Sequence, residues 1–343
     1  MSTARPVSFA VVGADHLHLF ELVDRLVAAG AIASAHAPLG DLTQLYADWR
    51  AESIETSVEA ILDDPDVDLV VLAGVPKDRA ELAIAALRRG KRVLSAKPGV
   101  TTPAQLGAIR EELAGRAGRP WTVLFTERFE NRAIGAAIDL ARSGALGEIV
   151  HVIGGGPHRL GAEGRPEWFW DHEATGGILV DIGSHQADQL LAIAFDGGAS
   201  AVVGEVRTSS VGNVACGEHP GMQDIGSMTL VANGVVGDHR VDFLTPDGLD
   251  SWGDVRLQIV GTRGTAEARA NVDPAGEAGA EHLIVVDREG TRRVDVSEHD
   301  VDWAPRFLAD LRDDGERLMS QAHVLEVCDL TLRAQEAAVP WGT

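Results

Sequence analysis

The residues best suited to chemistry lie between Gly176 and Asp188, where Asp181, His185 and Asp188 recur at intervals of four and three residues. If the segment after Gly177 forms one continuous helix, these three side chains share a face and the apolar residues between them pack inward. A carboxylate one turn before an imidazole can orient the ring and raise its pKa, which suits general acid and base catalysis near neutral pH. The structural alternative is a helix start in which Asp181 and His185 only cap the helix and bond to each other.

The length and composition are typical of a globular protein with two domains. The chain has 343 residues, against a typical domain size of roughly 150. No apolar run reaches the roughly 18 residues of a membrane-spanning helix, and no signal-peptide core follows the first residues. We therefore expect a cytoplasmic protein.

Charge and cysteine content exclude several classes of partner. The formal net charge of -22 argues against nucleic acid or an anionic membrane as a partner, because both need a basic surface. Cys216 and Cys328 are the two cysteines and do not form a Cys-x-x-Cys pair, so neither a disulfide framework nor a cysteine zinc site is expected.

The first part of the chain alternates short apolar runs with amphipathic helical segments. The strand-like runs occupy residues 7–13, 31–37, 67–73, 92–96 and 121–126. This alternation predicts a doubly wound α/β domain with a parallel sheet and a ligand crevice at the carboxyl ends of its strands. We assign residues 1–126 to this domain.

The pattern changes after Glu127. A helical segment covers residues 131–143, and apolar runs between residues 201 and 286 then alternate with polar residues and end in Asn-Gly, Asp-Gly and Arg-Gly turns. These features predict a second α+β domain, residues 127–343, built on an open and mostly antiparallel sheet. Residues 307–338 return to helical periodicity, and we leave open that this C-terminal helix packs back on the first domain.

The order of these motifs resembles a known family. The α/β first half, Lys97-Pro98 at the end of the fourth strand, and the Gly-Gly-x-x-x-Asp-x-Gly-x-His pattern ending at His185 together resemble the Gfo/Idh/MocA family, the relatives of glucose-fructose oxidoreductase and inositol dehydrogenase. The resemblance spans nearly the whole chain. It implies an NAD(P)-dependent dehydrogenase that acts on a ring hydroxyl of a sugar or cyclitol, with either NAD or NADP as cofactor. By resemblance, Lys97, Asp181 and His185 are catalytic.

This chemistry needs groups that move a proton. Oxidising a secondary alcohol removes the hydroxyl proton while hydride leaves carbon, so a base must lie within hydrogen-bond reach and a donor must stabilise the oxygen. Lys97 or His185 can take either part, with Asp181 fixing the imidazole orientation. The structural alternative for Lys97 is a solvent-facing lysine at the end of a strand.

The dinucleotide fingerprint departs from the G-x-G-x-x-G pattern, whose glycines allow a tight turn and a close approach to pyrophosphate. The corresponding run begins at Gly13 but has Asp15 and His18 in place of the other two glycines. Asp15 places negative charge near a helix start, which opposes phosphate binding. The predicted cofactor-binding residues are Gly13, Asp15, His16, His18, Ala73, Pro76 and Lys97.

Two further positions differ from the family, and two interpretations follow. The second strand ends without the usual ribose-binding carboxylate, and Ala96 replaces an acidic residue before Lys97. Either the altered loop still binds NAD(P), with Asp15 turned away and His16 or His18 facing phosphate, or cofactor binding has been lost. The second interpretation predicts a non-redox binding protein. A third possibility is an enzyme that retains its cofactor and catalyses net elimination, epimerisation or glycoside cleavage.

The run from Asp15 to His18 also invites a metal site. On a helix start, however, residues two apart point to different sides and no third imidazole is nearby in sequence, so we expect no metal.

Arginine and aromatic residues of the second domain are candidates for substrate contacts, because guanidinium groups and aromatic faces suit hydroxylated or acidic rings. The predicted substrate-binding residues are Arg128, His158, Arg159, Trp168 and Asp188. Trp168 is explained equally well by core packing or by a subunit interface. A small-molecule substrate and a homo-oligomer, a dimer or tetramer that covers the open sheet, are the expected partners.

Overall fold

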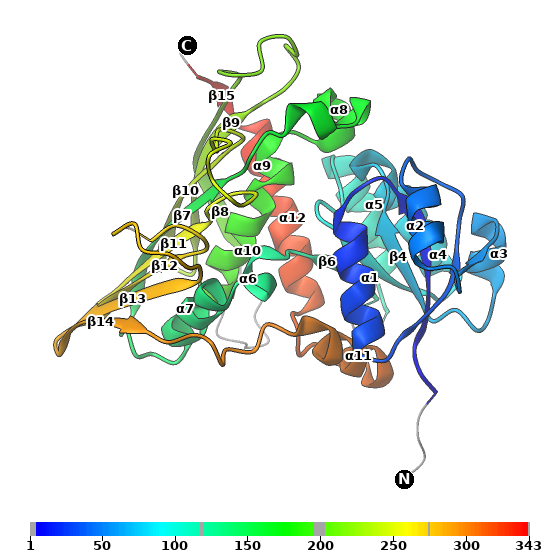
Figure 1. Cartoon of the computed structure of the whole chain (residues 1–343), viewed down its shortest axis with the longest axis horizontal. Helices are drawn as coiled ribbons and strands as arrows, with labels where there is room; N and C mark the ends of the chain where they lie inside the picture. The colour runs from blue at the N-terminus through cyan, green and yellow to red at the C-terminus, as the bar shows by residue number, and fades with distance from the viewer. Residues whose placement is uncertain (1–4, 117–119, 195–202, 274, 342–343) are drawn as a thin grey trace. The chain divides into compact units, whose positions relative to one another are not determined.

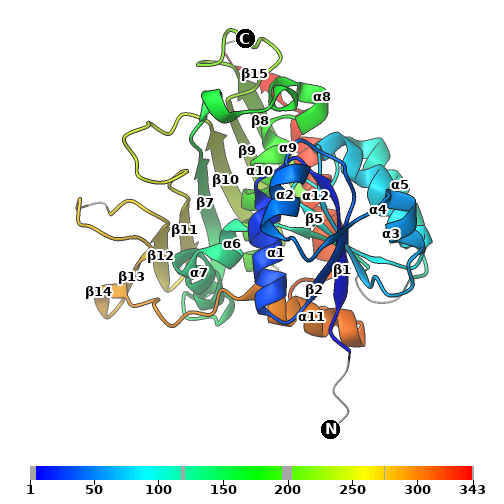
Figure 2. The same ribbon diagram turned by 45° about the vertical axis from the view of Figure 1, so that its right-hand side comes forward.

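The computed structural model describes residues 5–116, 120–194, 203–273 and 275–341 (Figures 1 and 2). The chain divides into two compact units. The first comprises Met1–Leu124 and Asp302–Leu325, and the second comprises Phe125–Val301 and Glu326–Thr343. The first unit therefore includes a segment from near the C-terminus. No helix in the described ranges is both long enough and apolar enough to cross a membrane.

The first unit is built on a six-stranded parallel sheet of order β3-β2-β1-β4-β5-β6. Its strands are β1 (Ser8–Ala14), β2 (Ile32–His36), β3 (Ile54–Glu55), β4 (Leu69–Ala73), β5 (Arg92–Ala96) and β6 (Trp121–Leu124). This confirms the predicted doubly wound sheet. The winding reverses between β1 and β4, and such reversals place a ligand crevice at the carboxyl ends of the strands.

In the part of the first unit that the structure describes, six α-helices and one short 3-10 helix accompany this sheet. They are α1 (His18–Ala28), α2 (Thr43–Trp49), α3 (Val58–Asp63), η1 (Pro76–Asp78), α4 (Arg79–Arg88), α5 (Pro103–Leu113) and α11 (Trp303–Asp313). Helix α1 buries Leu19, Leu22, Val23 and Leu26, which recur at helical spacing and so form one apolar face. Helix α11 packs beside α1, as both views show.

The second unit is built on a nine-stranded sheet of order β14-β13-β12-β11-β7-β10-β9-β8-β15. Its strands are β7 (Ile149–Pro157), β8 (Gly204–Gly212), β9 (Ile225–Ala232), β10 (Val235–Asp242), β11 (Arg256–Gly261), β12 (Gly264–Arg269), β13 (His282–Asp287), β14 (Gly290–Val294) and β15 (Val339–Pro340). Among the described strands of this sheet, only the β7–β10 and β8–β15 pairs are parallel, which confirms the mostly antiparallel sheet. The first two residues of the apolar run that begins at residue 201 lie outside the described ranges.

Helices cover one face of this second sheet (Figure 1). The helical elements of the unit are α6 (Glu127–Glu130), α7 (Arg132–Arg142), η2 (Ala162–Gly164), η3 (Glu167–Trp170), α8 (His172–Thr175), α9 (Ile178–Asp181), α10 (Gly183–Ala194) and part of α12 (Gln321–Glu336). Helix α10 lies close to the sheet because β7 has glycines beneath it. A Cβ at Gly154 would lie 3.3 Å from Gln186 Cγ, and one at Gly156 would lie 2.8 Å from Gln186 Nε2.

The segment around Asp181 and His185 differs from the continuous helix expected after Gly177. It forms two helices, with Asp181 at the end of α9 and His185 in the first turn of α10. Ile182 lies between them, and Ser184 Oγ donates to the Asp181 carbonyl at 2.9 Å. The apolar residues keep their helical spacing across the interruption, so periodicity alone could not reveal it.

His239 lies buried in β10 beneath α10, and its burial makes a testable contribution to pH-dependent stability. Within the part of the chain that the structure describes, neither ring nitrogen has a hydrogen-bond partner. Burial lowers the pKa of His239 from 6.5 to about 4. Between these two pH values, His239 is protonated in the unfolded chain but not in the folded chain. The free energy of unfolding therefore falls as pH drops from 6.5 toward 4.

We expect this histidine to account for about 3 kcal/mol of lost unfolding free energy over that range. Replacing His239 with leucine should remove that share of the pH dependence in urea unfolding measured at several pH values. His299→Gln is the control because that histidine is partly exposed. An unchanged pH dependence in His239→Leu would contradict the assignment.

Candidate active site

The loop after β1 lies against the loop after β4 at the carboxyl ends of these strands. Gly13 has φ 84°, and a Cβ there would lie 2.8 Å from Gly74 Cα, so only glycine fits. The backbone N–H groups of Asp15 and His16 both donate to the Ala73 carbonyl, at 3.0 and 2.9 Å. The first glycine of the fingerprint thus has its structural role, and Ala73 supports the loop through its backbone.

The Asp15 carboxylate is turned toward the loop after β2. Its Oδ1 accepts from the backbone N–H of Asp41 at 2.9 Å. Burial raises the pKa of Asp15, opposed by the backbone N–H groups of Asp41 and Val75 that stabilise the charged form. The carboxylate therefore joins the loops after β1, β2 and β4.

His16 and His18 lie at the start of α1. Their ring centroids are 4.3 Å apart with an interplanar angle of 61°, and the His18 backbone N–H donates to His16 Nδ1 at 3.2 Å. Both side chains are half-buried. Among the residues with described coordinates, no group of three or more His, Cys, Asp and Glu side chains is arranged to hold a metal ion.

Lys97 directly follows β5 and is buried, with 3% of its surface exposed. This burial excludes the solvent-facing lysine considered above. The backbone around Lys97 is held by Arg79, which sequence inspection did not single out. The buried Arg79 guanidinium donates from Nη1 to the carbonyls of Ala96, Lys97 and Pro98 at 2.7–3.0 Å and from Nε to Gly74 at 2.8 Å. Pro76, another predicted cofactor residue, is buried in the adjoining η1.

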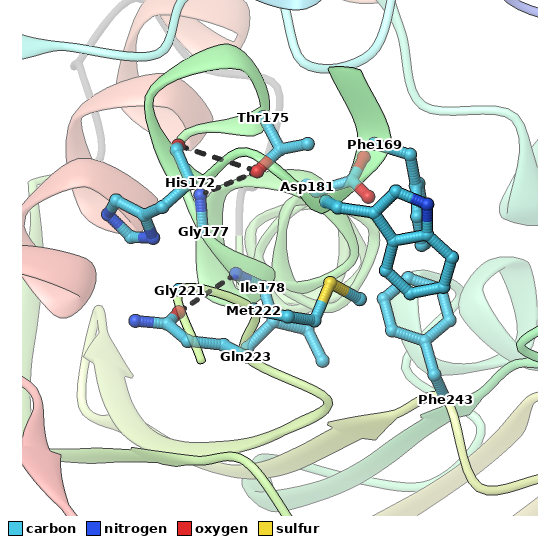
Figure 3. Close-up of a pocket in the computed structure, with 11 residues that line it drawn as sticks. Phe169, His172, Thr175, Gly177, Ile178, Asp181, Gly221, Met222, Gln223 and Phe243 are labelled. Carbon is cyan, nitrogen blue, oxygen red and sulfur yellow. Dashed lines mark hydrogen bonds between the residues drawn. The ribbon is translucent and has the colours of Figure 1, made fainter. Parts of the chain in front are cut away.

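In the second unit, Asp181 lines a small recess together with Phe169, Trp170, His172 and Met222 (Figure 3). The recess has a volume of about 10 Å³, which is room for roughly one water molecule. A hydrogen bond of 3.1 Å from the Ile178 backbone N–H to Gln223 Oε1 closes one side of it (Figure 3). His185 is buried one turn further on, in α10.

Two predicted substrate-binding residues, Arg128 and Asp188, contact each other. Arg128 Nε donates to Asp188 Oδ2 at 2.5 Å, and both side chains are largely buried. The Arg128 guanidinium also stacks on Phe129, 3.9 Å from the ring centroid. Within this unit the pair therefore fixes α6 to α10.

Glu127 is the centre of a buried polar cluster that sequence inspection missed. Its Oε2 accepts from Gln186 Nε2 at 3.0 Å and from Gln189 Nε2 at 2.9 Å, while its Oε1 lies 4.0 Å from His158 Nε2. The available signal was the pair of glutamines three residues apart, Gln186 and Gln189, in a helix that is buried along nearly its whole length. His158 therefore lies beside a carboxylate, within the predicted substrate-binding group.

The other two predicted substrate residues, Arg159 and Trp168, are not among the residues that line the recess around Asp181. Arg159 Nη2 donates to the Asp247 carbonyl at 3.3 Å, and Trp168 lies half-buried beside Phe169, with ring centroids 6.5 Å apart. Arg165 instead lies near the recess, with its guanidinium 4.2 Å from the Phe169 ring centroid. Burial lowers the pKa of Arg165, and the nearby charge of Asp181 opposes this effect.

Comparison with known proteins defines the class of this chain. Residues 7–123 match the oxidoreductase family with an NAD-binding Rossmann fold, and residues 134–267 match the GFO/IDH/MocA C-terminal domain. A crystal structure of a proposed oxidoreductase from Erwinia carotovora atroseptica SCRI1043 is 35% identical, with a TM-score of 0.91 over 98% of this chain and 100% of that one. Fold and sequence thus define an oxidoreductase with an NAD-binding Rossmann domain. The chain belongs to the Gfo/Idh/MocA family.

Relatives with named activities are more distant. The inositol 2-dehydrogenase of Acidothermus cellulolyticus is 27% identical over 317 residues, which cover 90% of this chain and 82% of that protein. The 1,5-anhydro-D-fructose reductase of Ensifer adhaerens is 34% identical over 155 residues, or 43% of this chain and 44% of the reductase. The chain therefore aligns with less than half the length of the reductase. Two solved structures of the same fold, 20% and 17% identical, hold NAD⁺ and NADP respectively.

Proposed function

We propose that this oxidoreductase transfers a hydride between NAD(P) and a secondary hydroxyl or ketone of a sugar-like or cyclitol substrate. The observation that carries the proposal is the burial of Lys97 directly after β5, at the edge of the sheet where doubly wound folds bind dinucleotides. A buried lysine with its backbone fixed by Arg79 is suited to proton transfer rather than to solvation. The named activities of the inositol dehydrogenase and anhydrofructose reductase relatives support the substrate class.

The residues of the first unit fit a dinucleotide in two respects. Gly13 permits the tight packing of the loop after β1 against Gly74, and α1 begins at the same carboxyl edge of the sheet, where doubly wound folds bind pyrophosphate. The loop after β1, with His16 and His18, would hold the phosphates, and Ala73 at the end of β4 and Pro76 in η1 would complete the cofactor site. When bound, the cofactor supplies the hydride acceptor or donor.

The residues of this chain supply the proton chemistry. One of Lys97 and His185 accepts the hydroxyl proton, the other donates a hydrogen bond that stabilises the developing charge on the substrate oxygen, and Asp181 orients His185. His158, beside Glu127, and the Arg128–Asp188 pair position the substrate ring.

The proposal is tested by incubating the purified protein with NAD⁺ or NADP⁺ and a panel of cyclitols, sugars and sugar lactones while following NAD(P)H absorbance. Net reduced cofactor with at least one polyol is expected. Substrate consumption without net NAD(P)H would instead support transient oxidation in an elimination, epimerisation or glycoside cleavage. Failure to bind any dinucleotide would support the non-redox binding protein.

Asp15 provides a prediction on cofactor affinity. Asp15→Asn keeps an oxygen that can accept from the Asp41 N–H but removes a negative charge close to the start of α1. A charge at a helix N-terminus is worth about 0.3–1 kcal/mol, so we expect dinucleotide binding to tighten by up to about fivefold. Calorimetric titration measures the effect, with Asp66→Asn on an exposed turn as the control. Weaker binding in Asp15→Asn would show that its charge supports the loop more than it repels phosphate.

We also propose that the chain forms a homo-oligomer through the face of the second sheet opposite α7 and α10. Strand register places six apolar side chains on that face, all half-buried or exposed: Val231, Val236, Ile153, Val260, Ile284 and Val286. The same register places His151, Asp238, Gln258 and Glu267 among them, so the face is mixed in character, as subunit interfaces commonly are.

Ile153 lies near the middle of this face and is 44% exposed. Ile153→Lys is expected to convert the oligomer to a monomer in light scattering coupled to gel filtration, because burying the ammonium group in an apolar interface is unfavourable. Ala145→Lys, at an exposed position after α7, should leave the assembly unchanged. An oligomer of the same mass in Ile153→Lys would rule out this face.

A further inference from the structure

The second unit contains a cavity of about 260 Å³ that differs in character from the recess at Asp181. Its polar lining consists of Glu127, Glu130, Glu281, Asn131, Asn271 and Trp252, and its three other lining residues are aliphatic. This volume approaches the lower end of the roughly 300–1,000 Å³ range of small-molecule sites. The cavity can therefore hold one monosaccharide-sized ring.

The aromatic wall of the cavity is held in place before any ligand arrives. The Trp252 carbonyl accepts from the Arg159 backbone N–H at 2.6 Å, and its indole lies 4.7 Å from the His158 ring centroid. Asn271 Nδ2 donates to the neighbouring Gly253 carbonyl at 2.6 Å. Trp252 nevertheless remains 50% exposed. A fixed and exposed indole beside a cavity is suited to stacking on the C–H face of a hydroxylated ring.

The polar groups of the cavity are mainly hydrogen-bond acceptors. Three of its lining residues carry carboxylates, and none is a lysine or arginine. Two of the carboxylates are anchored from outside: Glu281 accepts from the Arg132 N–H and Nη1 at 2.8 and 3.1 Å, and Glu127 accepts from the two α10 glutamines. Ionised carboxylates only accept hydrogen bonds. A ligand must therefore offer donors, and a carboxylate or phosphate on the ligand would meet like charge.

We propose that this cavity binds a polyhydroxylated ring that bears an amino group, such as an amino sugar or aminocyclitol. The ring stacks on Trp252, and its ammonium group pairs with Glu130 and Glu281 through charge-assisted hydrogen bonds. The same cavity rejects uronic acids and sugar phosphates. The assignment of this ring as a substrate or product of the enzyme rests on the proposed function. Binding of the ring in the cavity requires no cofactor.

The test is calorimetric titration of the full chain without added dinucleotide. It is carried out at about pH 7, where amines are largely protonated. The probes are D-glucosamine, D-glucose and D-glucuronate. Glucosamine is expected to bind roughly tenfold more tightly than glucose, as one charge-assisted hydrogen bond implies, and glucuronate is expected to bind most weakly. Glu130→Gln and Glu281→Gln should each reduce the preference for glucosamine, and Trp252→Ala should weaken both glucosamine and glucose.

Glu289→Gln is the matched control, because it removes the same charge from an exposed turn of the same unit. Glucuronate binding as tightly as glucosamine, or a preference that survives both cavity substitutions, would overturn the inference. The experiments distinguish a failure of the cavity assignment from a failure of the oxidoreductase proposal. Turnover of neutral polyols without an amine preference would refute only the cavity assignment, whereas cavity-dependent glucosamine binding by a protein without dinucleotide affinity would refute only the hydride transfer.

Discussion

Lys97→Ala is expected to lower kcat/KM about 10²- to 10⁴-fold, the usual contribution of a positioned acid or base. The physical reason is that the buried Lys97 side chain follows β5 at the crevice edge of the sheet, with its backbone held by Arg79. Lys97→Arg should also be inactive, because a guanidinium stays protonated and cannot accept a proton. Steady-state kinetics with the best polyol substrate measures both.

Lys77→Ala is the control for this prediction, since Lys77 is an exposed lysine of the same unit. Far-UV circular dichroism and dinucleotide titration must show that Lys97→Ala is folded and binds cofactor. A folded, cofactor-binding Lys97→Ala with kcat/KM within a few-fold of the parent protein would remove Lys97 from the proposed mechanism.

His185→Gln is expected to cause the second large loss, again about 10²- to 10⁴-fold in kcat/KM. Glutamine preserves polarity in a buried position at the first turn of α10 but cannot exchange a proton near neutral pH. The dependence of kcat/KM on pH should lose one of its two sloping limbs in this variant, because one titrating group is removed. That second readout separates proton transfer from a purely structural contribution.

Two further variants sharpen the assignment of His185. Asp181→Asn should lower activity less than His185→Gln, because it disturbs the orientation of the imidazole and leaves the ring present. His299→Gln, a partly exposed histidine of the same unit, should be as active as the parent protein. If His185→Gln retained both limbs of the pH profile, the histidine would have only a structural role.

The fold could be predicted from sequence because its signals are local. Buried strands of five to seven residues alternate with helices in the first unit, and each has the apolar run that a parallel sheet requires. Alternating patterns bounded by glycine turns similarly indicate the antiparallel strands of the second unit. The interruption at Ile182 was missed, because the apolar spacing continues through it.

The candidate site was predicted less completely, because its contacts join residues far apart in the chain. The orientation of Asp15 depends on the backbone of Asp41 and Val75, and no local pattern encodes that contact. The bond between Glu127 and the α10 glutamines spans about sixty residues. Arg79 was overlooked because a lone arginine at a helix start resembles a solvated one, and only its burial reveals its bonds around Lys97.

The central claim is that the altered loop after β1 still binds a dinucleotide that serves hydride transfer. Its most direct test is a calorimetric titration of the purified protein with NAD⁺, NADP⁺ and their reduced forms, after checking the absorbance spectrum for cofactor retained through purification. Micromolar or tighter binding of at least one form is predicted, because Gly13 keeps the tight loop after β1 and α1 begins at the carboxyl edge of the sheet, where doubly wound folds bind pyrophosphate. A protein that is free of cofactor and binds none of the four forms would contradict the account.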